Sequence, residues 1–533
     1  MVAQCSECGA FVVSNPRGFD LNDITPRTLA RISQLLTSNE PPQEPELKVL
    51  RSVASNTAAR LTCLDADISR LQNQLKQLQD ERAALAEYHA QNTTILSPLR
   101  RIPSEILGEI FYWSLPFNPT PNMKDAPWVL THVSRRWRAV AILNASLWSK
   151  IYLDFNTVTK YSSAMVRTQT ERARVLKISF HGSSMHDSHP QIDTLRVLLE
   201  RSFIWEELRL DLTATLVPLM TVYRGRFTVL RRVWVEWDGS ESQAAVQSLN
   251  FLRMAVALTD ITVFSQYRFL PTLLPVHHQL TRYDFDAPWA THYELLKSLP
   301  NLHEVRITRD FDLTLPWPQP GEPIRLLHLR CLYVSDPAIL NYLAAPVLER
   351  LAIMDNDGIA TSSHLDPFLT RSSCSVCRLC IAGLPDVQST TAVLQQQHSI
   401  TELAIMVKDV GDDDEDTERD VLTAFLTHFT TSNSTGILPH ISRLDFGCEN
   451  ADTIPYSLYL NMLASRWNAH YCALKAAELL LLNAGIVPDP QSLAKIDILR
   501  KEGMQLSYLS GNEAEDRADQ WLHVPSWAPT WAR

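Results

Sequence analysis

Residues 96–151 read LSPLRRIPSEILGEIFYWSLPFNPTPNMKDAPWVLTHVSRRWRAVAILNASLWSKI, and this stretch decides how the chain is interpreted. Pro103 ends an extended entry, and Ser104 can cap a helix that starts there. Apolar side chains then recur at spacings of three and four residues, at Ile106, Leu107, Ile110 and Phe111. This spacing predicts a helix with one apolar face.

Two further short helices are predicted in the same stretch. The second begins near Pro127 and places Val133 and Trp137 on one side, and the third carries Leu147 and Trp148. Three short helices this apolar cannot bury all of their apolar surface among themselves. We therefore expect part of that surface to bind another protein.

The order of these residues resembles the F-box family, whose pattern runs Leu-Pro-x-Glu-Ile/Leu-Leu-x-x-Ile-Phe, then Val-Cys/Ser-Arg-x-Trp-Arg, then Leu-Trp. Here the three parts read IPSEILGEIF from residue 102, VSRRWR from residue 133 and LW from residue 147. Ile102 replaces the usual leucine, Ser134 replaces the frequent cysteine, and the segment 116–127 is longer than in the commonest members. The alternative is a generic helical hairpin with a tryptophan core.

The resemblance implies a domain at 96–151 that binds a Skp-type adaptor protein and, through it, a cullin. The chain would then hold an unknown protein substrate for ubiquitin transfer, without catalysing a reaction itself. The residues expected to contact the adaptor or to shape the hairpin are Pro103, Ile106, Leu107, Ile110, Phe111, Val133, Trp137 and Trp148. The sequence does not separate the contacting residues from the internal core.

The amino-acid composition is that of a folded protein, and the chain as a whole has no excess of positive charge. The 533 residues are 45% hydrophobic and 20% charged, with a formal net charge of −10, which argues against nucleic acid as a partner. Residues 97–150 differ, because seven Lys/Arg against three Asp/Glu give them a net charge of +4. A locally basic surface on an acidic chain favours an acidic partner.

Compartment, membrane and metal predictions follow from the N-terminus and the cysteines. MVAQCSECGAFVV is not a signal peptide, no apolar run is long enough to span a membrane, and nine cysteines form no regular framework. We predict cytoplasm and/or nucleus. Cys5-x-x-Cys8 could be half of a zinc site, but the second half is missing, so we predict no metal and no cofactor.

Residues 1–55 are predicted to be loosely ordered, with a proline-rich linker at 38–46, and a long helix follows at 56–92. Its apolar residues alternate steps of three and four, at Leu61, Leu64, Ile68, Leu71, Leu75, Leu78 and Leu85. Arg82 occupies one position of this seam, where a polar residue weakens a dimer but can set its register. Two interpretations stay open: a coiled coil, formed by self-association through 61–85 or with a partner protein, or a helix that lies against the rest of the chain.

After the first domain, a pattern of three apolar residues at positions i, i+3 and i+5 occurs twelve times. It occurs at Val175/Ile178/Phe180, Trp205/Leu208/Leu210, Leu230/Val233/Val235, Leu258/Ile261/Val263, Leu280/Tyr283/Phe285, Leu302/Val305/Ile307, Leu329/Leu332/Val334, Leu348/Leu351/Ile353, Val376/Leu379/Ile381, Ile400/Leu403/Ile405, Ile441/Leu444/Phe446 and Ala476/Leu479/Leu481. The two-apart pair predicts a strand with one buried face, and helix-like runs lie between the strands. The spacing is that of a leucine-rich repeat, so we predict an α/β fold with an irregular solenoid of parallel strands at 170–485.

In such a solenoid the residue between the buried pair points to the concave face, where extended partners bind. The residues of types that dominate interfaces, and acidic neighbours on the same side, are the substrate-binding candidates: Arg209, Trp234, Glu236, Asp284, Arg306 and Tyr333.

The end of the chain gives two further expectations. The acidic run at 409–420 is either a solvated loop or a contact for a basic partner. Residues 486–533, with Trp521, Trp527 and Trp531, are predicted to cap the last repeat, with a peptide-like docking tail as the alternative.

The sequence has no phosphate-binding glycine loop, no nucleophile elbow and no HExxH motif, so we predict no enzymatic activity. A non-catalytic scaffold assembled through the coiled coil is the competing function.

Overall fold

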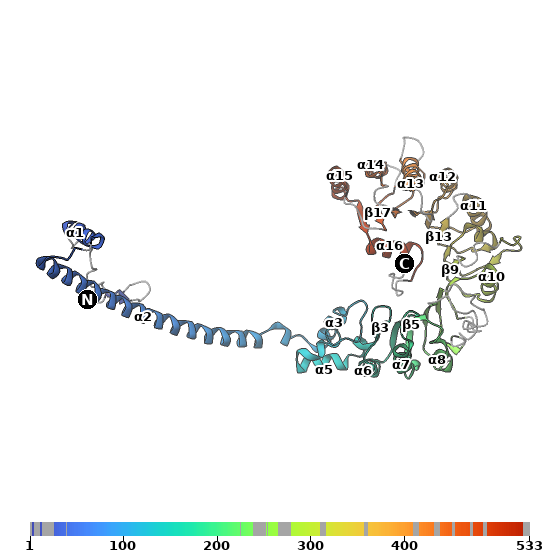
Figure 1. Cartoon of the computed structure of the whole chain (residues 1–533). Helices are drawn as coiled ribbons and strands as arrows, with labels where there is room; N and C mark the ends of the chain where they lie inside the picture. The colour runs from blue at the N-terminus through green and yellow to red at the C-terminus, as the bar shows by residue number, and fades with distance from the viewer. Residues whose placement is uncertain are drawn as a thin grey trace. The chain divides into compact units, whose positions relative to one another are not determined.

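The computed structural model describes residues 3–4, 11–12, 26–38, 40–223, 225–237, 252, 254–264, 279–309, 316–355, 361–408, 415–430, 437–449, 454–469, 473–482 and 488–525. The chain divides into two compact units, Met1–Pro103 and Ser104–Arg533. The fold is mixed α/β, with a long N-terminal helix in the first unit and a large parallel sheet in the second (Figure 1). Cys5, Cys8, Trp527, Trp531 and residues 409–414 of the acidic run lie outside the described residues.

The first unit contains the strand pair β1 (Ala3–Gln4) and β2 (Phe11–Val12), helix α1 (Pro26–Thr37) and helix α2 (Glu44–Ile95). The 52-residue α2 begins at Glu44 and not near residue 56, so part of the predicted loose segment and linker is helical. Pro45 lies in the first turn, where proline is preorganised for a helix, and the backbone N–H of Gln43 donates to Glu46 at 2.9 Å. The prolines of 38–46 therefore mark a helix start.

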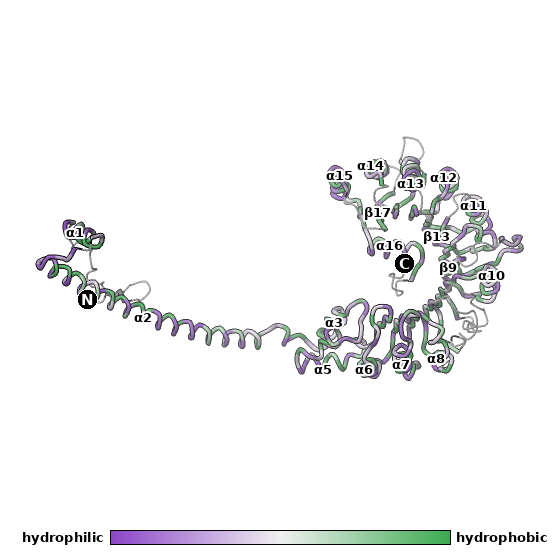
Figure 2. The backbone as a smooth tube through the Cα atoms, in the orientation of Figure 1, coloured by the Kyte–Doolittle hydropathy of each residue, from purple (hydrophilic) through white to green (hydrophobic). Residues whose placement is uncertain are grey.

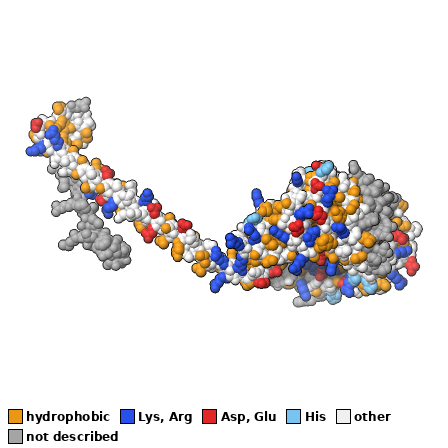
Figure 3. Space-filling view, turned by 90° about the horizontal axis from the view of Figure 1, so that it is seen from below, with side chains coloured by type: hydrophobic (Ala, Val, Ile, Leu, Met, Phe, Trp, Pro, Cys, Tyr) orange, Lys and Arg blue, Asp and Glu red, His pale blue; other side chains and the backbone are white. Residues whose placement is uncertain are grey.

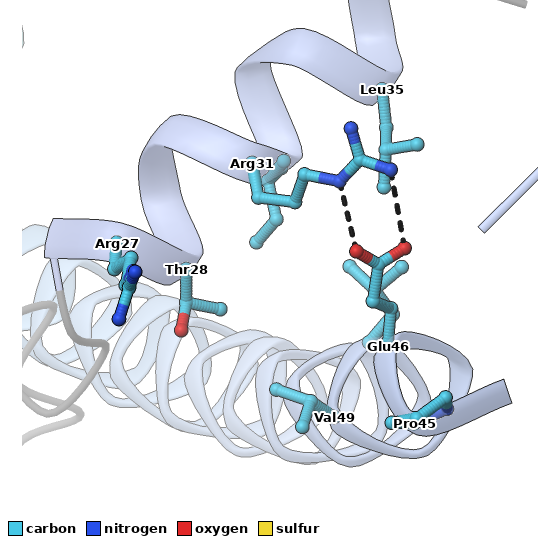
Figure 4. A pocket seen from close by; sticks show the side chains of 9 residues that line it. Arg27, Thr28, Arg31, Leu35, Pro45, Glu46 and Val49 are labelled. Carbon is cyan, nitrogen blue, oxygen red and sulfur yellow. Dashed lines mark hydrogen bonds and ion pairs between the residues drawn. The ribbon is translucent and has the colours of Figure 1, made fainter. Parts of the chain in front are cut away.

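Helix α1 packs on the first turns of α2. The Arg31 guanidinium donates to the Glu46 carboxylate at 2.9 Å, beside a cavity of about 320 Å³ that is lined on the α2 side by Pro45, Val49 and Leu50 (Figure 4). This contact fixes a helical hairpin at the start of the chain.

The predicted seam of α2 is exposed along its length. Hydrophobic and hydrophilic residues alternate along the helix (Figure 2), and none of its residues is buried. The seven seam residues, from Leu61 to Leu85, are each at least 40% exposed. An apolar stripe of this length is typical of a helix that pairs with another helix.

The second unit opens with a helical segment, which runs to Trp148. Its elements are α3 (Ser104–Trp113), α4 (Leu130–Val133), α5 (Arg135–Leu143) and the 3₁₀ turn η3 (Ala145–Trp148). The Ser134 hydroxyl accepts the N–H of Trp137 at 3.1 Å and so caps α5, and the Asn144 side chain caps η3. The helical segment leads directly into the first strand of the sheet.

Among the described residues, fourteen parallel strands form one sheet in which each strand pairs with the next one along the chain. They are β3 (Lys150–Asp154), β4 (Leu176–His181), β5 (Trp205–Leu212), β6 (Arg232–Trp237), β7 (Asp260–Phe264), β8 (Arg282–Asp286), β9 (Glu304–Thr308), β11 (Cys331–Val334), β13 (Arg350–Asp355), β14 (Arg378–Gly383), β15 (Glu402–Val407), β16 (Arg443–Cys448), β17 (Ala476–Leu481) and β18 (Gln505–Ser510). All twelve predicted strands are present. The sheet also includes β3 and β18, which lie outside the predicted range 170–485.

Helices and 3₁₀ turns connect the strands, and they lie on the outer side of the arc that the strands follow (Figure 1). They are α6 (Ser163–Arg172), α7 (Ser188–Leu199), η4 (Ser202–Ile204), α8 (Val217–Val222), α10 (Trp289–Ser298), η8 (Pro337–Tyr342), α11 (Thr361–Ser372), α12 (Val387–Gln396), α13 (Glu415–Phe429), α14 (Tyr456–Trp467) and α15 (Pro490–Lys501). The short strands β10 (Ile324–Arg325) and β12 (Leu343–Ala344) pair separately. Aspartates cap several of these elements, as Asp187 does for α7 and Asp489 for α15.

The opposite side of the sheet is called the inner face here. Strand register places one residue of each strand in a continuous row across it, as predicted. From β3 to β16 the row reads Tyr152, Ser179, Arg209, Trp234, Thr262, Asp284, Arg306, Tyr333, Ala352, Cys380, Ala404 and Asp445.

Burial along the strands changes from one end of the sheet to the other. In β3 and β4 buried residues alternate with half-buried ones over most of the strand, as expected for a strand with one covered face. In β14 to β17, five of the six residues in each strand are buried without alternation. That pattern requires cover on both faces.

The second cover is the C-terminal helix α16 (Asn512–Trp521). After β18 the chain turns at Gly511, whose φ of +58° favours glycine, and α16 then contacts β17 and β18. Its residues Ala514, Ala518 and Trp521 join one buried apolar cluster with inner-face residues such as Ala404 and Met406. Trp521 therefore covers the inner face, and the helix that carries it contacts the last two strands of the sheet. In the part of the chain that the structure describes, no helix has the length and apolar character needed to cross a lipid bilayer.

Candidate interaction surfaces

Helix α3 separates the predicted adaptor-binding residues into two groups. Leu107 and Phe111 are each 1% exposed and form part of the core, whereas Ile106 is 53% exposed and Ile110 is 45% exposed. Pro103, immediately before the helix, is also exposed. The helix thus has one apolar side that is buried in the core and a second apolar side that is exposed.

The other three predicted residues divide in the same way. Trp148 is fully buried, its Nε1–H donates to the Ala141 carbonyl at 2.7 Å, and the Arg172 guanidinium of α6 lies 4.4 Å from its ring centroid. Trp137 is half-buried, with its ring 4.8 Å from that of Phe111. Val133 is exposed at the end of α4. Trp148 anchors the helical segment to the sheet, while Val133 is open to a partner.

A residue that the sequence prediction omitted belongs with the open group. Trp113, at the end of α3, is 81% exposed and follows Ile106 and Ile110 at helical spacing. We call Ile106, Ile110, Trp113 and Val133 the exposed apolar set. Arg135 and Arg138 on α5 are exposed as well, and Lys and Arg side chains gather at this end of the second unit (Figure 3). The spacing of Trp113 from Ile106 is the signal that could have identified it.

The predicted substrate-binding residues share the inner face, but most of them are buried. Arg209, Trp234, Asp284, Arg306 and Tyr333 are all at most 6% exposed, and only Glu236 is half-buried. The expectation that these side chains form an open binding surface is therefore wrong. They pack on one another: the Arg209 guanidinium lies 5.0 Å from the Trp234 ring, and that of Arg306 lies 4.1 Å from the Tyr333 ring.

Ion pairs occupy the middle of the inner face. Arg282 contacts Asp260 at 3.1 Å, Asp284 at 3.3 Å and Glu304 at 3.1 Å. At the neighbouring site, burial lowers the pKa of Arg209, and burial raises the pKa of Glu236, which lies 3.9 Å from Arg209. Such buried, mutually paired charges contribute to the specificity of the fold more than to a surface for a partner.

An open cavity remains where the helical segment meets the first strands. It has a volume of about 320 Å³ and lies between the loop after α3 and strands β3 to β6. Its lining residues are Tyr112, Phe117, Asn118, Pro119, Lys150, Ile151, Tyr152, Lys177, Ile178, Ser179, Glu207, Arg209 and Arg232. Four of these are cations and one, Glu207, is an anion, which Lys177 contacts at 2.8 Å and Arg232 at 3.2 Å. The charge and the aromatic rim suit an acidic segment of another protein.

Within the described residues, no cluster of histidine, cysteine and carboxylate side chains has the geometry of a metal site. Neither the comparison with protein-family models nor the comparison with curated proteins found a match for this chain.

Proposed function

We propose that this chain is the substrate-recognition adaptor of a cullin-RING ubiquitin ligase. In this proposal the exposed apolar set docks on a Skp-type adaptor protein, which binds the cullin, and the solenoid holds the protein substrate. Tethering acts through proximity, because it converts transfer between two free molecules into a local event. The chain itself contributes no catalytic residue, and it acts in the cytoplasm or nucleus.

One observation carries the docking half of the proposal. The helical segment has the residue order of an F-box and leaves Ile106, Ile110, Trp113 and Val133 open, although its own core is already filled by Leu107, Phe111 and Trp148. Exposed apolar residues gathered on one small segment mark a protein-interaction site. The exposed arginines of α5 would speed association with an acidic adaptor.

The cavity beside β3 to β6 supports the substrate half. It opens on the same unit as the exposed apolar set, and Tyr112 of α3, the helix that carries most of that set, lines it. Lys150, with Lys177 and Arg232 beside it, offers charge to an acidic segment. This replaces the buried middle of the inner face as the proposed substrate site.

The test is binding of the full chain to a purified Skp-type adaptor, measured by calorimetry. Ile106→Asp/Ile110→Asp should abolish binding without unfolding the chain, because both side chains are exposed. Ile498→Asp on α15 is the matched control, since Ile498 is 55% exposed at the far end of the sheet, and it should bind as wild type does. Equal affinity of all three chains, or no binding by wild type, would refute the docking proposal.

A second function is favoured by the exposed seam of α2. A chain that pairs through residues 61–85 and binds no Skp-type adaptor would be a protein-interaction scaffold without ligase function. Self-association together with failure of the adaptor test would favour this alternative.

A further inference from the structure

The groove that α16 fills is built from small inner-face residues. Successive positions of the row are Ala352, Cys380 and Ala404, and Gly447 lies beside Met406 so closely that a Cβ would meet its sulfur. Ala352, Cys380 and Ala404 have short side chains and Gly447 has none, so the strands β13 to β16 leave room for a helix. The segment that enters carries Ala514, Ala518 and Trp521, spaced to lie on one side of α16.

Trp521 is the anchor of this contact. Its Nε1–H donates to the Asp445 carboxylate at 2.9 Å, and the Arg378 guanidinium lies 3.8 Å from its ring centroid. Arg517 of the same helix contacts Glu478 at 2.9 Å. A buried tryptophan with a satisfied N–H and a stacked arginine is typical of the central residue of a protein–protein interface.

The residues that follow the anchor fit their site poorly. His523 adopts φ of +60°, a left-handed conformation that is uncommon for residues other than glycine, although histidine adopts it more often than most. Its side chain is buried, and Nε2 has no hydrogen-bond partner among the described residues. An unsatisfied buried polar atom weakens the contact that contains it.

The segment itself contributes no negative charge at the same place, where Arg282, Arg306 and Arg378 contact carboxylates of the sheet. His523 lies where four inner-face arginines act on its imidazole, namely Arg282, Arg306, Arg350 and Arg378. Residues 521–525 read WLHVP and contain no carboxylate to answer these cations. The segment offers only the His523 carbonyl, which accepts from Arg282 Nη2 at 3.0 Å. A carboxylate at this position would form charge-assisted hydrogen bonds that the native segment cannot form.

We propose that residues 512–525 are an internal ligand of the inner-face groove, and that a segment of a partner protein displaces them. The displacing segment carries an aromatic anchor on a helical turn and an acidic residue two positions after it. It binds in the place of α16, with its ring between Arg378 and Asp445 and its carboxylate beside Arg282, which contacts His523 in the native segment. The proposal deepens the proposed substrate-recognition function. Only the biological identity of the partner rests on that function.

The experiment uses the full chain and a fluorescent synthetic peptide of residues 511–525. In Trp521→Ala the internal segment loses its anchor while the groove stays intact, so this variant should bind the peptide at least tenfold more tightly than wild type does. Phe203→Ala is the matched control, because Phe203 is an exposed aromatic residue on η4, outside both proposed binding surfaces, and it should behave as wild type. A peptide carrying His523→Glu should bind Trp521→Ala at least tenfold more tightly than the native peptide. Adding Ala404→Phe to that variant should fill the groove and abolish binding.

Two outcomes would overturn the proposal: a folded Trp521→Ala chain that binds no peptide, or a His523→Glu peptide that binds no better than the native one. If Trp521→Ala does not fold, hydrogen exchange of the wild-type chain decides. Residues 512–525 should exchange at least tenfold faster than strands β14 to β16. Equal protection would show that α16 opens only with the whole sheet and is not a displaceable ligand. None of these measurements involves the Skp-type adaptor, so failure here and failure of the docking proposal are distinguishable.

Discussion

The Arg282 guanidinium on β8 donates to the backbone carbonyl of His523, 241 residues later in the chain, at 3.0 Å. This hydrogen bond attaches the C-terminal segment to the middle of the sheet, while Trp521 attaches it to β14 and β16. The stability of this attachment determines how accessible the inner face is, and it can be varied with pH.

Attachment of residues 512–525 should weaken as pH falls below about 6.5. Burial, together with Arg350, Arg378, Arg306 and Arg282, lowers the pKa of His523 to about 3. A group whose pKa is lowered on burial contributes stability that is present above its free pKa of about 6.5 and is lost below it. Between pH 6.5 and pH 5 the loss is about 2 kcal/mol at most. Hydrogen exchange of residues 512–525, corrected for intrinsic rates, measures it. His523→Gln should remove the pH dependence, and a pH dependence that persists in this variant would contradict the assignment.

Asp445 should give the opposite pH dependence for unfolding of the sheet. Burial raises the pKa of this carboxyl to about 6, despite the contact with Arg443. Stability from such a group is fully present below its unfolded pKa of about 4 and is lost as pH rises through about 6. Asp445→Asn keeps an acceptor for Trp521 and removes the titration. Urea unfolding from pH 4 to pH 7 should show wild type losing up to about 3 kcal/mol relative to Asp445→Asn. Parallel profiles for the two chains would argue against it.

Neighbouring residues of α3 should have different roles. Leu107→Ala should lower the free energy of unfolding by about 2–5 kcal/mol, because Leu107 is buried. Ile106→Ala should change it by less than about 0.5 kcal/mol, because Ile106 is exposed. Chemical denaturation measures both values. A large loss for Ile106→Ala would mean that this residue belongs to the core and not to the exposed apolar set.

The cavity beside β3 to β6 should bind acidic peptides in a salt-dependent way. Lys150→Glu/Lys177→Glu reverses two of its four cations and should weaken binding of a poly-glutamate peptide at least tenfold. Fluorescence anisotropy of the labelled peptide at two salt concentrations measures this. Lys495→Glu/Lys501→Glu on α15 changes the net charge by the same amount and is the control. An equal loss in the control would attribute binding to general electrostatics.

Helix α2 should self-associate through its seam. Leu71→Asp/Leu78→Asp places charge on the stripe and should yield a monomer in sedimentation equilibrium, whereas Asn73→Asp, outside the stripe, should not. Arg82→Leu completes the stripe and should strengthen association. A wild-type chain that is monomeric at all accessible concentrations would refute self-association.

The sequence was sufficient to predict the strands but not what covers them. The two-apart apolar pair located twelve strands because each strand contributes the same buried pair to one continuous core. It missed β18, because QLSYLS at the edge of the sheet is half polar. The row from Arg209 to Tyr333 was placed on the correct face by register alone.

Exposure depends on contacts between residues far apart in sequence, and for this reason it could not be read from the repeats. Tyr333 and Ala352 are covered by a helix that begins at Asn512. Within α3, Ile106, Leu107, Ile110 and Phe111 are equally apolar, so periodicity could not tell the filled side from the open one. The succession of small residues Ala352, Cys380 and Ala404 was the available sign that something enters the groove.

A stack of parallel strands in chain order has only nearest-neighbour contacts, and such an array can unfold from either end one repeat at a time. The C-terminal segment changes this, because it connects β17 through Arg517, β16 and β14 through Trp521, and β8 through His523. It therefore couples the middle of a long one-dimensional array to its C-terminal strands, and it should make the melting of these repeats cooperative. Displacing the segment would divide one unfolding transition into several, so that occupancy of the groove would govern whether the strands from β8 to β17 unfold together.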